Sequence, residues 1–192
     1  MFTKKETECL KKLLISAINQ QRSQSRSEAL TEEDEQTLIS LVSAHNKIKL
    51  LNNKLSKQST TVTMPRILVV DDADSMLGVM TQLLFSIGFT KVDTAKSAER
   101  ALSMLLEAAK IEKYYDIVIT DWEMTGKSGL DLLKQIRLHE HLLETDVYIL
   151  SSHCEQENIL QAIQAGVTGY MLKPINAVAL QKKLGFYLPD KN

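Results

Sequence analysis

The chain has 192 residues, 44% of them hydrophobic, which is enough for one medium-sized domain with an additional segment or for two small domains. Its 23 basic and 24 acidic residues give a net charge of −1, which argues against binding of nucleic acid through bulk positive charge. The two cysteines, Cys9 and Cys154, lie far apart without metal-like spacing, so we expect reduced thiols in a cytoplasmic protein.

Residues 1–58 are predicted to form a hairpin of two amphipathic helices. Apolar residues recur at helical spacing in two stripes, Leu10, Leu13, Leu14, Ala17 and Ile18 in the first and Leu38, Leu41, Val42, Ile48, Leu51 and Leu55 in the second. Charges interrupt the first stripe every few positions, which excludes a signal peptide or a membrane span. Because two helices alone bury little surface, the hairpin is expected to be an interaction or dimerisation module.

Residues 59–65, at the end of the polar stretch "SKQSTTVTMP", are predicted to be a linker. From residue 66 to residue 192, short β-branched runs alternate with longer helical segments, which is typical of βαβ units. Strands are expected at residues 67–70, 91–94, 117–120, 147–150 and 169–172. Helices are expected to begin near residues 75, 97, 129 and 155, and a last one to run from about 176 to 187. The predicted fold class is α/β, with a doubly wound, five-stranded parallel sheet.

Polar side chains stand at the ends of four predicted strands. "RILVVDD" ends in Asp71 and Asp72, and "DIVITD" ends in Asp121. "VYILSS" brings Ser151 to the end of the fourth strand, and "GYMLKP" places Lys173 after the fifth. Ligands of open α/β sheets bind beyond the carboxyl ends of the strands. If these strands are neighbours, three acids, a hydroxyl and an ammonium group converge on one edge of the sheet.

Three carboxylates close together imply a cation. Two unit charges about 5 Å apart repel each other by roughly 3 kcal/mol at an effective dielectric constant of about 20. Oxygen ligands without His or Cys favour a hard ion, and a few carboxylates with room for water suit Mg²⁺. Such a site stabilises a phosphoryl group in transfer, and one of its carboxylates can be the nucleophile that forms an aspartyl phosphate. Asp121 is the expected acceptor.

The motifs "ILVVDD", "DIVITDWEM", "ILSS" and "GYMLKP", in this order, resemble the receiver domain of two-component response regulators, and most closely its single-domain chemotaxis type. The resemblance covers about residues 65–188 and implies a flavodoxin-like sheet with strand order 2-1-3-4-5. It implies a regulator rather than an enzyme, phosphorylated by a histidine kinase or a phosphotransfer protein. The expected output is contact with a protein target, with a second copy of the chain as a further candidate partner. Direct contact with nucleic acid or a membrane is not expected.

The resemblance also implies which residues accept the phosphoryl group and hold the metal ion. Asp121 matches the aspartate that becomes phosphorylated. Asp72 matches the carboxylate that binds Mg²⁺ directly, and Asp71 matches its neighbour, which acts through water. Glu123, two residues after the acceptor, lies where the family supplies a main-chain carbonyl to the metal.

Three further residues match positions that respond to the phosphoryl group. Ser151 matches a hydroxyl that moves toward it, and Lys173 matches a lysine that pairs with it. Tyr170 matches an aromatic residue that turns inward when the hydroxyl moves, and so is the expected switch. One departure stands out, because Thr125 occupies a position where the family commonly has proline.

Each residue taken alone has a simpler explanation. Asp71 or Asp74 could cap a helix, Ser151 could belong to a turn, Lys173 could be a solvated charge, and Tyr170 could be an ordinary core residue. Their joint order along the chain favours the receiver.

Three other functions are weighed against a phosphorylation-controlled regulator. The main alternative is a constitutive scaffold in which the hairpin binds the partner. A phosphatase with related Mg²⁺ chemistry is disfavoured, since no cap domain is visible. A transcription factor is disfavoured, since no helix-turn-helix precedes the receiver and no output domain is expected after it.

Overall fold

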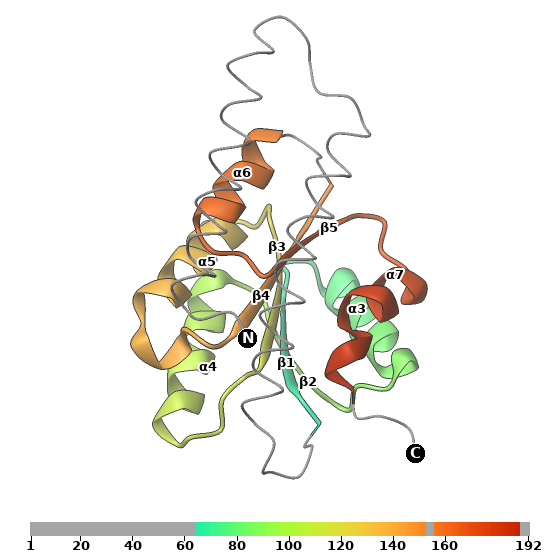
Figure 1. Ribbon diagram of the computed structural model, residues 1–192, viewed down its shortest axis with the longest axis horizontal. Coiled ribbons are helices and arrows are strands. Elements are labelled where there is room, and N and C mark those ends of the chain that lie inside the picture. The colour runs from blue at the N-terminus through green and yellow to red at the C-terminus, as the bar shows by residue number, and fades with distance from the viewer. Residues whose placement is uncertain (1–63, 153–155, 189–192) are drawn as a thin grey trace, which may run out of the picture. The chain divides into compact units, whose positions relative to one another are not determined.

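The computed structural model describes residues 64–152 and 156–188. Within these ranges strands and helices alternate along the chain, as the colours of Figure 1 show. The predicted hairpin at 1–58 and nearly all of the predicted linker at 59–65 lie outside the described residues. Those two assignments, and the exact domain boundaries, stay predictions.

All five predicted strands are confirmed, each to within one residue at either end. In chain order the elements are β1 (Arg66–Val70), α3 (Asp74–Ile87), β2 (Lys91–Ala95), α4 (Ala98–Lys110), β3 (Ile117–Asp121), α5 (Gly129–Leu138), η1 (Glu140–Leu142), β4 (Asp146–Ser151), α6 (Gln156–Gln164), β5 (Gly169–Leu172), α7 (Ala177–Leu184) and η2 (Gly185–Tyr187). The short 3₁₀ helix η1 was not predicted, because three residues are too few to show a helical period. The last predicted helix, 176–187, is divided into α7 and the 3₁₀ helix η2.

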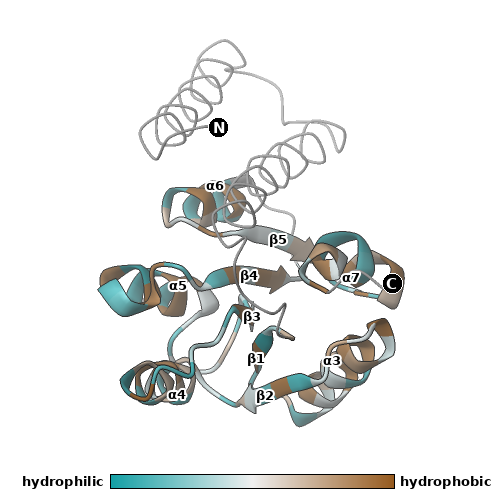
Figure 2. Ribbon diagram, turned by 60° about the horizontal axis from the view of Figure 1, so that its bottom comes forward, coloured by the Kyte–Doolittle hydropathy of each residue, from teal (hydrophilic) through white to brown (hydrophobic). Residues whose placement is uncertain are grey.

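The sheet has the order β2-β1-β3-β4-β5, and every neighbouring pair is parallel. Figure 2 shows the strands in this order, with β2 at the bottom and β5 at the top. In the register, Ile67 stands opposite Val92 on one side and Ile117 on the other. The predicted order 2-1-3-4-5 is therefore confirmed, and the carboxyl ends of all strands meet at the same edge.

Two layers of helices cover the sheet and bury its central strands. Helices α3 and α7 lie on one face, and α4, α5 and α6 lie on the other (Figures 1 and 2). Every residue of β3 and β4 is buried, as expected for a parallel strand covered on both faces. The edge strand β2, with the sequence "KVDTA", is mostly exposed or half-buried. The apolar runs in the sequence are thus explained by burial between two layers.

Three of the described helices begin at a polar cap residue. Ser97, Ser128 and Asn176 each accept a hydrogen bond from a main-chain N–H in the first turn of α4, α5 and α7. At α3 the cap position is Ala73, whose side chain makes no such bond, and Asp74 is the first helical residue. Asp74 is therefore not the helix cap. None of the helices in the described ranges combines the length and the apolar character needed to span a membrane.

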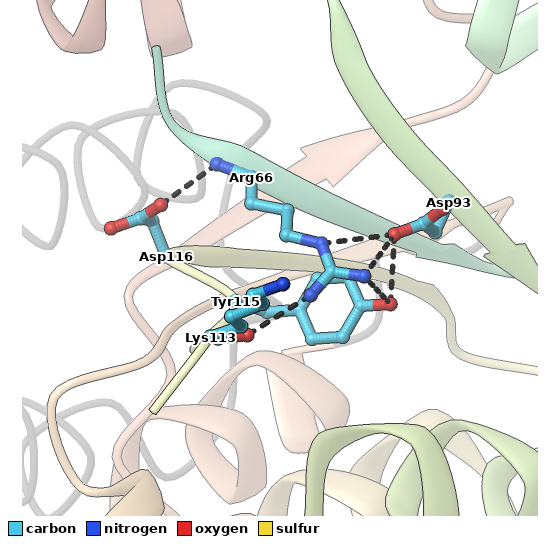
Figure 3. A network of polar contacts seen from close by, with 5 residues as sticks. All are labelled: Arg66, Asp93, Lys113, Tyr115 and Asp116. Atoms are coloured by element: carbon cyan, nitrogen blue, oxygen red, sulfur yellow. Dashed lines mark hydrogen bonds and ion pairs between the residues drawn. The ribbon is translucent and has the colours of Figure 1, made fainter. Parts of the chain in front are cut away.

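At the amino edge of the sheet, Arg66 joins β1 to β2 and to the segment before β3 (Figure 3). Its guanidinium donates to Asp93 at 2.8 and 3.1 Å and to the hydroxyl of Tyr115 at 3.0 Å. It also donates to the main-chain carbonyl of Lys113 at 3.0 Å, while the main-chain N–H of Arg66 donates to Asp116 at 2.7 Å. Burial, followed by the neighbouring Asp93 carboxylate, raises the pKa of Tyr115 to about 12. This network fixes the start of β1.

A second polar cluster at the amino edge attaches the 3₁₀ helix η2 to β4. Asp146 is 7% exposed, and its Oδ2 accepts from the hydroxyl of Tyr187 at 2.7 Å. Its Oδ1 accepts from the hydroxyl of Thr168 at 3.0 Å. The hydroxyls of Tyr148 and Tyr187 lie 3.2 Å apart. Both oxygens of this buried carboxylate therefore have hydrogen-bond donors.

Candidate functional site

Two buried carboxylates and one ammonium group meet at the carboxyl edge of the sheet. Lys173 Nζ lies 2.9 Å from Asp121 Oδ1 and 3.4 Å from Asp71 Oδ2. The exposed fraction of the side chain is 5% for Asp71, 11% for Asp121 and 17% for Lys173. The structure thus brings together three of the residues that the sequence placed at strand ends.

Main-chain hydrogen bonds continue the parallel pairing just beyond the strands and fix the residues that carry these side chains. The N–H of Asp71 donates to the carbonyl of Ala95 at 3.2 Å, and the N–H of Lys173 donates to the carbonyl of Ser151 at 2.8 Å. Asp71 Oδ1 also accepts from the N–H of Ala73 at 2.9 Å, so this carboxylate supports the turn before α3 as well as contacting Lys173.

Charge is unevenly distributed in the site, because two carboxylates share one ammonium group. Burial raises the pKa of Asp121 above its usual value, Lys173 opposes that rise, and Asp71 adds to it. For Lys173, burial alone would lower the pKa, but the hydrogen bond and charge of Asp121, together with Asp71, raise it overall. Lys173 is therefore held in its charged form, and a carboxylate charge remains that a second cation could balance.

The ligand chemistry at this edge fits Mg²⁺. Asp71 and Asp121 supply carboxylate oxygens, and both carboxylates are nearly removed from solvent. Hard divalent cations prefer such oxygen ligands, and Mg²⁺ is commonly bound by one or two carboxylates with water completing its shell. Two of the three carboxylates expected from the sequence, Asp71 and Asp121, thus lie together beside Lys173.

Asp72, the third predicted carboxylate, is held by Thr125 instead. Its Oδ2 accepts from the main-chain N–H of Thr125 at 2.8 Å and from its hydroxyl at 2.7 Å. These hydrogen bonds, the hydroxyl first, lower the pKa of Asp72. Within residues 64–152 and 156–188, no three acidic, His or Cys side chains gather closely enough to hold a metal ion. The expected convergence of three carboxylates is therefore not seen.

The remaining predicted residues lie close to the site in sequence and fold. Ser151 ends β4 and is 1% exposed, whereas Glu123 is exposed in the loop after β3. Tyr170, in β5, is buried, and its ring centroid lies 6.2 Å from that of Trp122. The tyrosine ring is therefore already inside the domain. Its movement on phosphorylation, and the roles of Ser151 and Glu123, stay predictions.

The sequence did not single out Gly129, which begins α5 and packs directly on the acceptor strand. A Cβ atom at this position would overlap the main-chain carbonyl oxygen of Asp121 and would also crowd Thr120. The N–H of Gly129 donates to the carbonyl of Trp122 at 3.1 Å. A glycine in the first turn of a helix, where it is a poor helix former, was the available signal.

Comparison with known proteins agrees with this geometry. Residues 67–185 match the family described as the response regulator receiver domain. The chain belongs to this family. Two similar relatives are chemotaxis protein CheY-3 of Vibrio cholerae, 40% identical over 119 residues, and chemotaxis protein CheY of Pseudomonas aeruginosa, 36% identical over 119 residues. The matched part is 62% of this chain, 88% of the first relative and 92% of the second.

Solved receiver structures have the same fold. CheY4 of Vibrio cholerae, a chemotaxis response regulator, superposes with a TM-score of 0.58 at 28% identity, covering 66% of this chain and 100% of that one. A response regulator receiver domain protein from Clostridium thermocellum gives a TM-score of 0.57 at 31% identity, covering 64% and 93%. The predicted family and its place in two-component signal transduction are thereby confirmed.

Proposed function

We propose that the chain is a cytoplasmic, phosphorylation-controlled response regulator in which Asp121 accepts the phosphoryl group. The observation that carries this proposal is the 2.9 Å contact between Asp121 and Lys173 beside Asp71. A buried acceptor next to a fixed ammonium group is suited to receiving a group that is itself strongly negative.

The phosphoryl donor is a phosphohistidine on a histidine kinase or a phosphotransfer protein. A carboxylate oxygen of Asp121 attacks phosphorus, so a P–O bond forms while the P–N bond to the donor breaks. The leaving imidazole keeps the electron pair and takes up a proton. Lys173 stays beside the acceptor and offsets the charge that the phosphoryl oxygens bring.

Asp71, Asp72 and the main-chain carbonyl of Glu123 are the proposed Mg²⁺ ligands, together with Asp121. When bound, Mg²⁺ neutralises charge on the transferring phosphoryl oxygens. Hydrolysis by water later returns the Asp121 carboxylate and releases inorganic phosphate. The chain therefore carries one phosphoryl group at a time, unlike a phosphatase with steady turnover.

The signal leaves the domain as a change in its contacts with a protein target. In this proposal the hydroxyl of Ser151 moves to bind the new phosphoryl oxygens, and the ring of Tyr170 settles against the space it leaves. Ser151 and Tyr170 lie on the adjacent strands β4 and β5. A local change in charge is thereby passed to the surface around β5.

Intact mass spectrometry tests the proposal directly. The full chain is incubated with Mg²⁺ and a small acyl phosphate, and we expect one base-labile phosphoryl adduct per chain. Asp121→Asn should form none. Asp116→Asn, which alters an exposed carboxylate at the amino edge, should form the same adduct as the wild type. No adduct on the wild type, or an equal one on Asp121→Asn, would favour the constitutive scaffold instead.

A further inference from the structure

Thr125 makes two hydrogen bonds to a single oxygen of Asp72. Its main-chain N–H and its hydroxyl both donate to Oδ2, at 2.8 and 2.7 Å. Thr125 lies in the loop between β3 and α5, four residues after the acceptor. The loop that follows Asp121 is thus connected directly to the segment that follows β1.

This contact gives Asp72 a different partner from the other two carboxylates. Asp71 and Asp121 both contact Lys173. In the described part of the chain, Asp72 does not join them in a group of three side chains that could hold a metal ion. An Asp72 carboxylate that joined Asp71 and Asp121 around a cation would have to turn from its present position. The Thr125 bonds oppose that turn, because they hold the carboxylate where it is.

We propose that Thr125 is a positioning residue that competes with Mg²⁺ for Asp72 and thereby lowers the affinity of the site for the cation. This inference rests on the proposed function, since it concerns the metal site that the function requires. Binding of the cation then releases Thr125 and frees the loop between β3 and α5 from the segment after β1. The loop thereby responds to occupancy of the site before phosphorylation.

If Thr125 instead orients Asp72 for the metal ion, removing its hydroxyl should weaken Mg²⁺ binding rather than strengthen it. An outer hydrogen-bond partner often orients a metal ligand, and removing such a partner weakens binding. A partner that holds the ligand in a different position lowers the apparent affinity by the fraction of molecules that are competent to bind. The bonds of Asp72 to Thr125, while Asp71 and Asp121 contact Lys173, favour competition.

The test compares two substitutions that differ in the hydroxyl. Thr125→Val removes the hydroxyl but keeps the branched shape and the main-chain N–H, and Thr125→Ser keeps the hydroxyl. Mg²⁺ is titrated at constant ionic strength and followed by the fluorescence of Trp122, the single tryptophan of the chain. Main-chain amide NMR signals of the same samples measure the affinity independently. We expect Thr125→Val to bind Mg²⁺ about threefold to tenfold more tightly and Thr125→Ser to stay within about twofold of the wild type.

Asp72→Asn, alone and combined with Thr125→Val, decides whether the effect passes through Asp72. We expect Thr125→Val to change the affinity only when Asp72 is present. Equal or weaker binding by Thr125→Val, or an unchanged gain in the Asp72→Asn background, would overturn the inference.

The wild type separates this outcome from failure of the proposed function. Mg²⁺ binding and an Asp121 adduct in the wild type, with unchanged affinity in Thr125→Val, would overturn competition alone. A wild type with neither property would overturn both proposals. Thermal unfolding of each variant confirms that the compared proteins are folded.

Discussion

Carboxylates at the two edges of the sheet have different hydrogen-bond and ion-pair partners. At the amino edge, the buried Asp146 receives hydroxyl donors on both oxygens, and the partly exposed Asp93 receives the guanidinium of Arg66. At the carboxyl edge, Asp71 and Asp121 share the single ammonium group of Lys173. The same residue type is therefore structural at one edge and poised for chemistry at the other.

The difference teaches that burial alone does not mark a reactive carboxylate. A satisfied buried carboxylate stabilises the fold, and removing its donor leaves an unpaired acceptor. A carboxylate that shares its cation with another acid keeps charge that a metal ion or a phosphoryl group can use. Substitutions of the charged side chains at the carboxyl edge should thus change phosphorylation, and substitutions of the hydrogen-bonded side chains at the amino edge should change stability.

The largest effect should follow from Lys173→Met. Removing the ammonium group takes away the charge that faces the incoming phosphoryl group, so the phosphorylation rate should fall by about a hundredfold. The rate is measured by intact mass against time with an acyl phosphate donor. Lys183→Met, on α7, is the control, and an equal loss in that variant would contradict the role of Lys173.

Gly129→Ala should give the next largest effect, a loss of about 2 kcal/mol in the free energy of unfolding. The new Cβ atom overlaps the carbonyl oxygen of Asp121, which is main chain and cannot move freely. Urea denaturation measures the change. Gly78→Ala is the matched control, because nothing lies within 4 Å of a Cβ there and alanine should stabilise α3. Equal stability of the two variants would refute the close contact.

At the amino edge, Tyr187→Phe should cost about 1 kcal/mol of stability and leave phosphorylation unchanged. The substitution removes the hydroxyl that donates to Asp146 at 2.7 Å and leaves a buried acceptor short of one partner. Denaturation and the phosphorylation assay are run on the same protein. Tyr114→Phe, at an exposed tyrosine, is the control for stability. A change in phosphorylation without a change in stability would contradict the proposed structural role of the amino edge.

The smallest effect concerns pH. Burial raises the pKa of Asp121, and only its charged form attacks phosphorus, so phosphorylation should decline as pH falls through a value above the usual 3.8. Because Lys173 lowers that pKa, Lys173→Met should move the decline to higher pH. Rates measured between mildly acidic and neutral pH, with a donor stable over that range, check both directions. A decline that moved to lower pH in the variant would contradict the assigned charges.

Sequence patterns predicted the sheet and much of the carboxyl edge for a physical reason. Parallel strands bring their carboxyl ends to one edge, so Asp71, Asp121 and Lys173 could be placed together from their positions after apolar runs. The contact between Asp72 and Thr125 could not be predicted, because the direction of an exposed side chain follows from loop geometry and leaves no periodic signal.

The amino-edge contacts were hidden for a second reason. Tyr187 and Asp146 lie 41 residues apart in the chain, and neither local sequence indicates that the two side chains are in contact. Gly129 was visible as a weak helix former, but its overlap with the acceptor strand depends on how closely α5 approaches β3. Contacts that depend on how closely one element packs on another could therefore not be predicted from the sequence.

Mapping the phosphoryl group within the chain tests the central claim most directly. After phosphorylation with Mg²⁺ and an acyl phosphate, borohydride reduction marks the modified carboxyl group, and peptide mass spectrometry locates it. The account predicts one mark, on Asp121, and none on Asp93 or Asp146 at the opposite edge. A mark on either of those residues, or none at saturating donor, would contradict it.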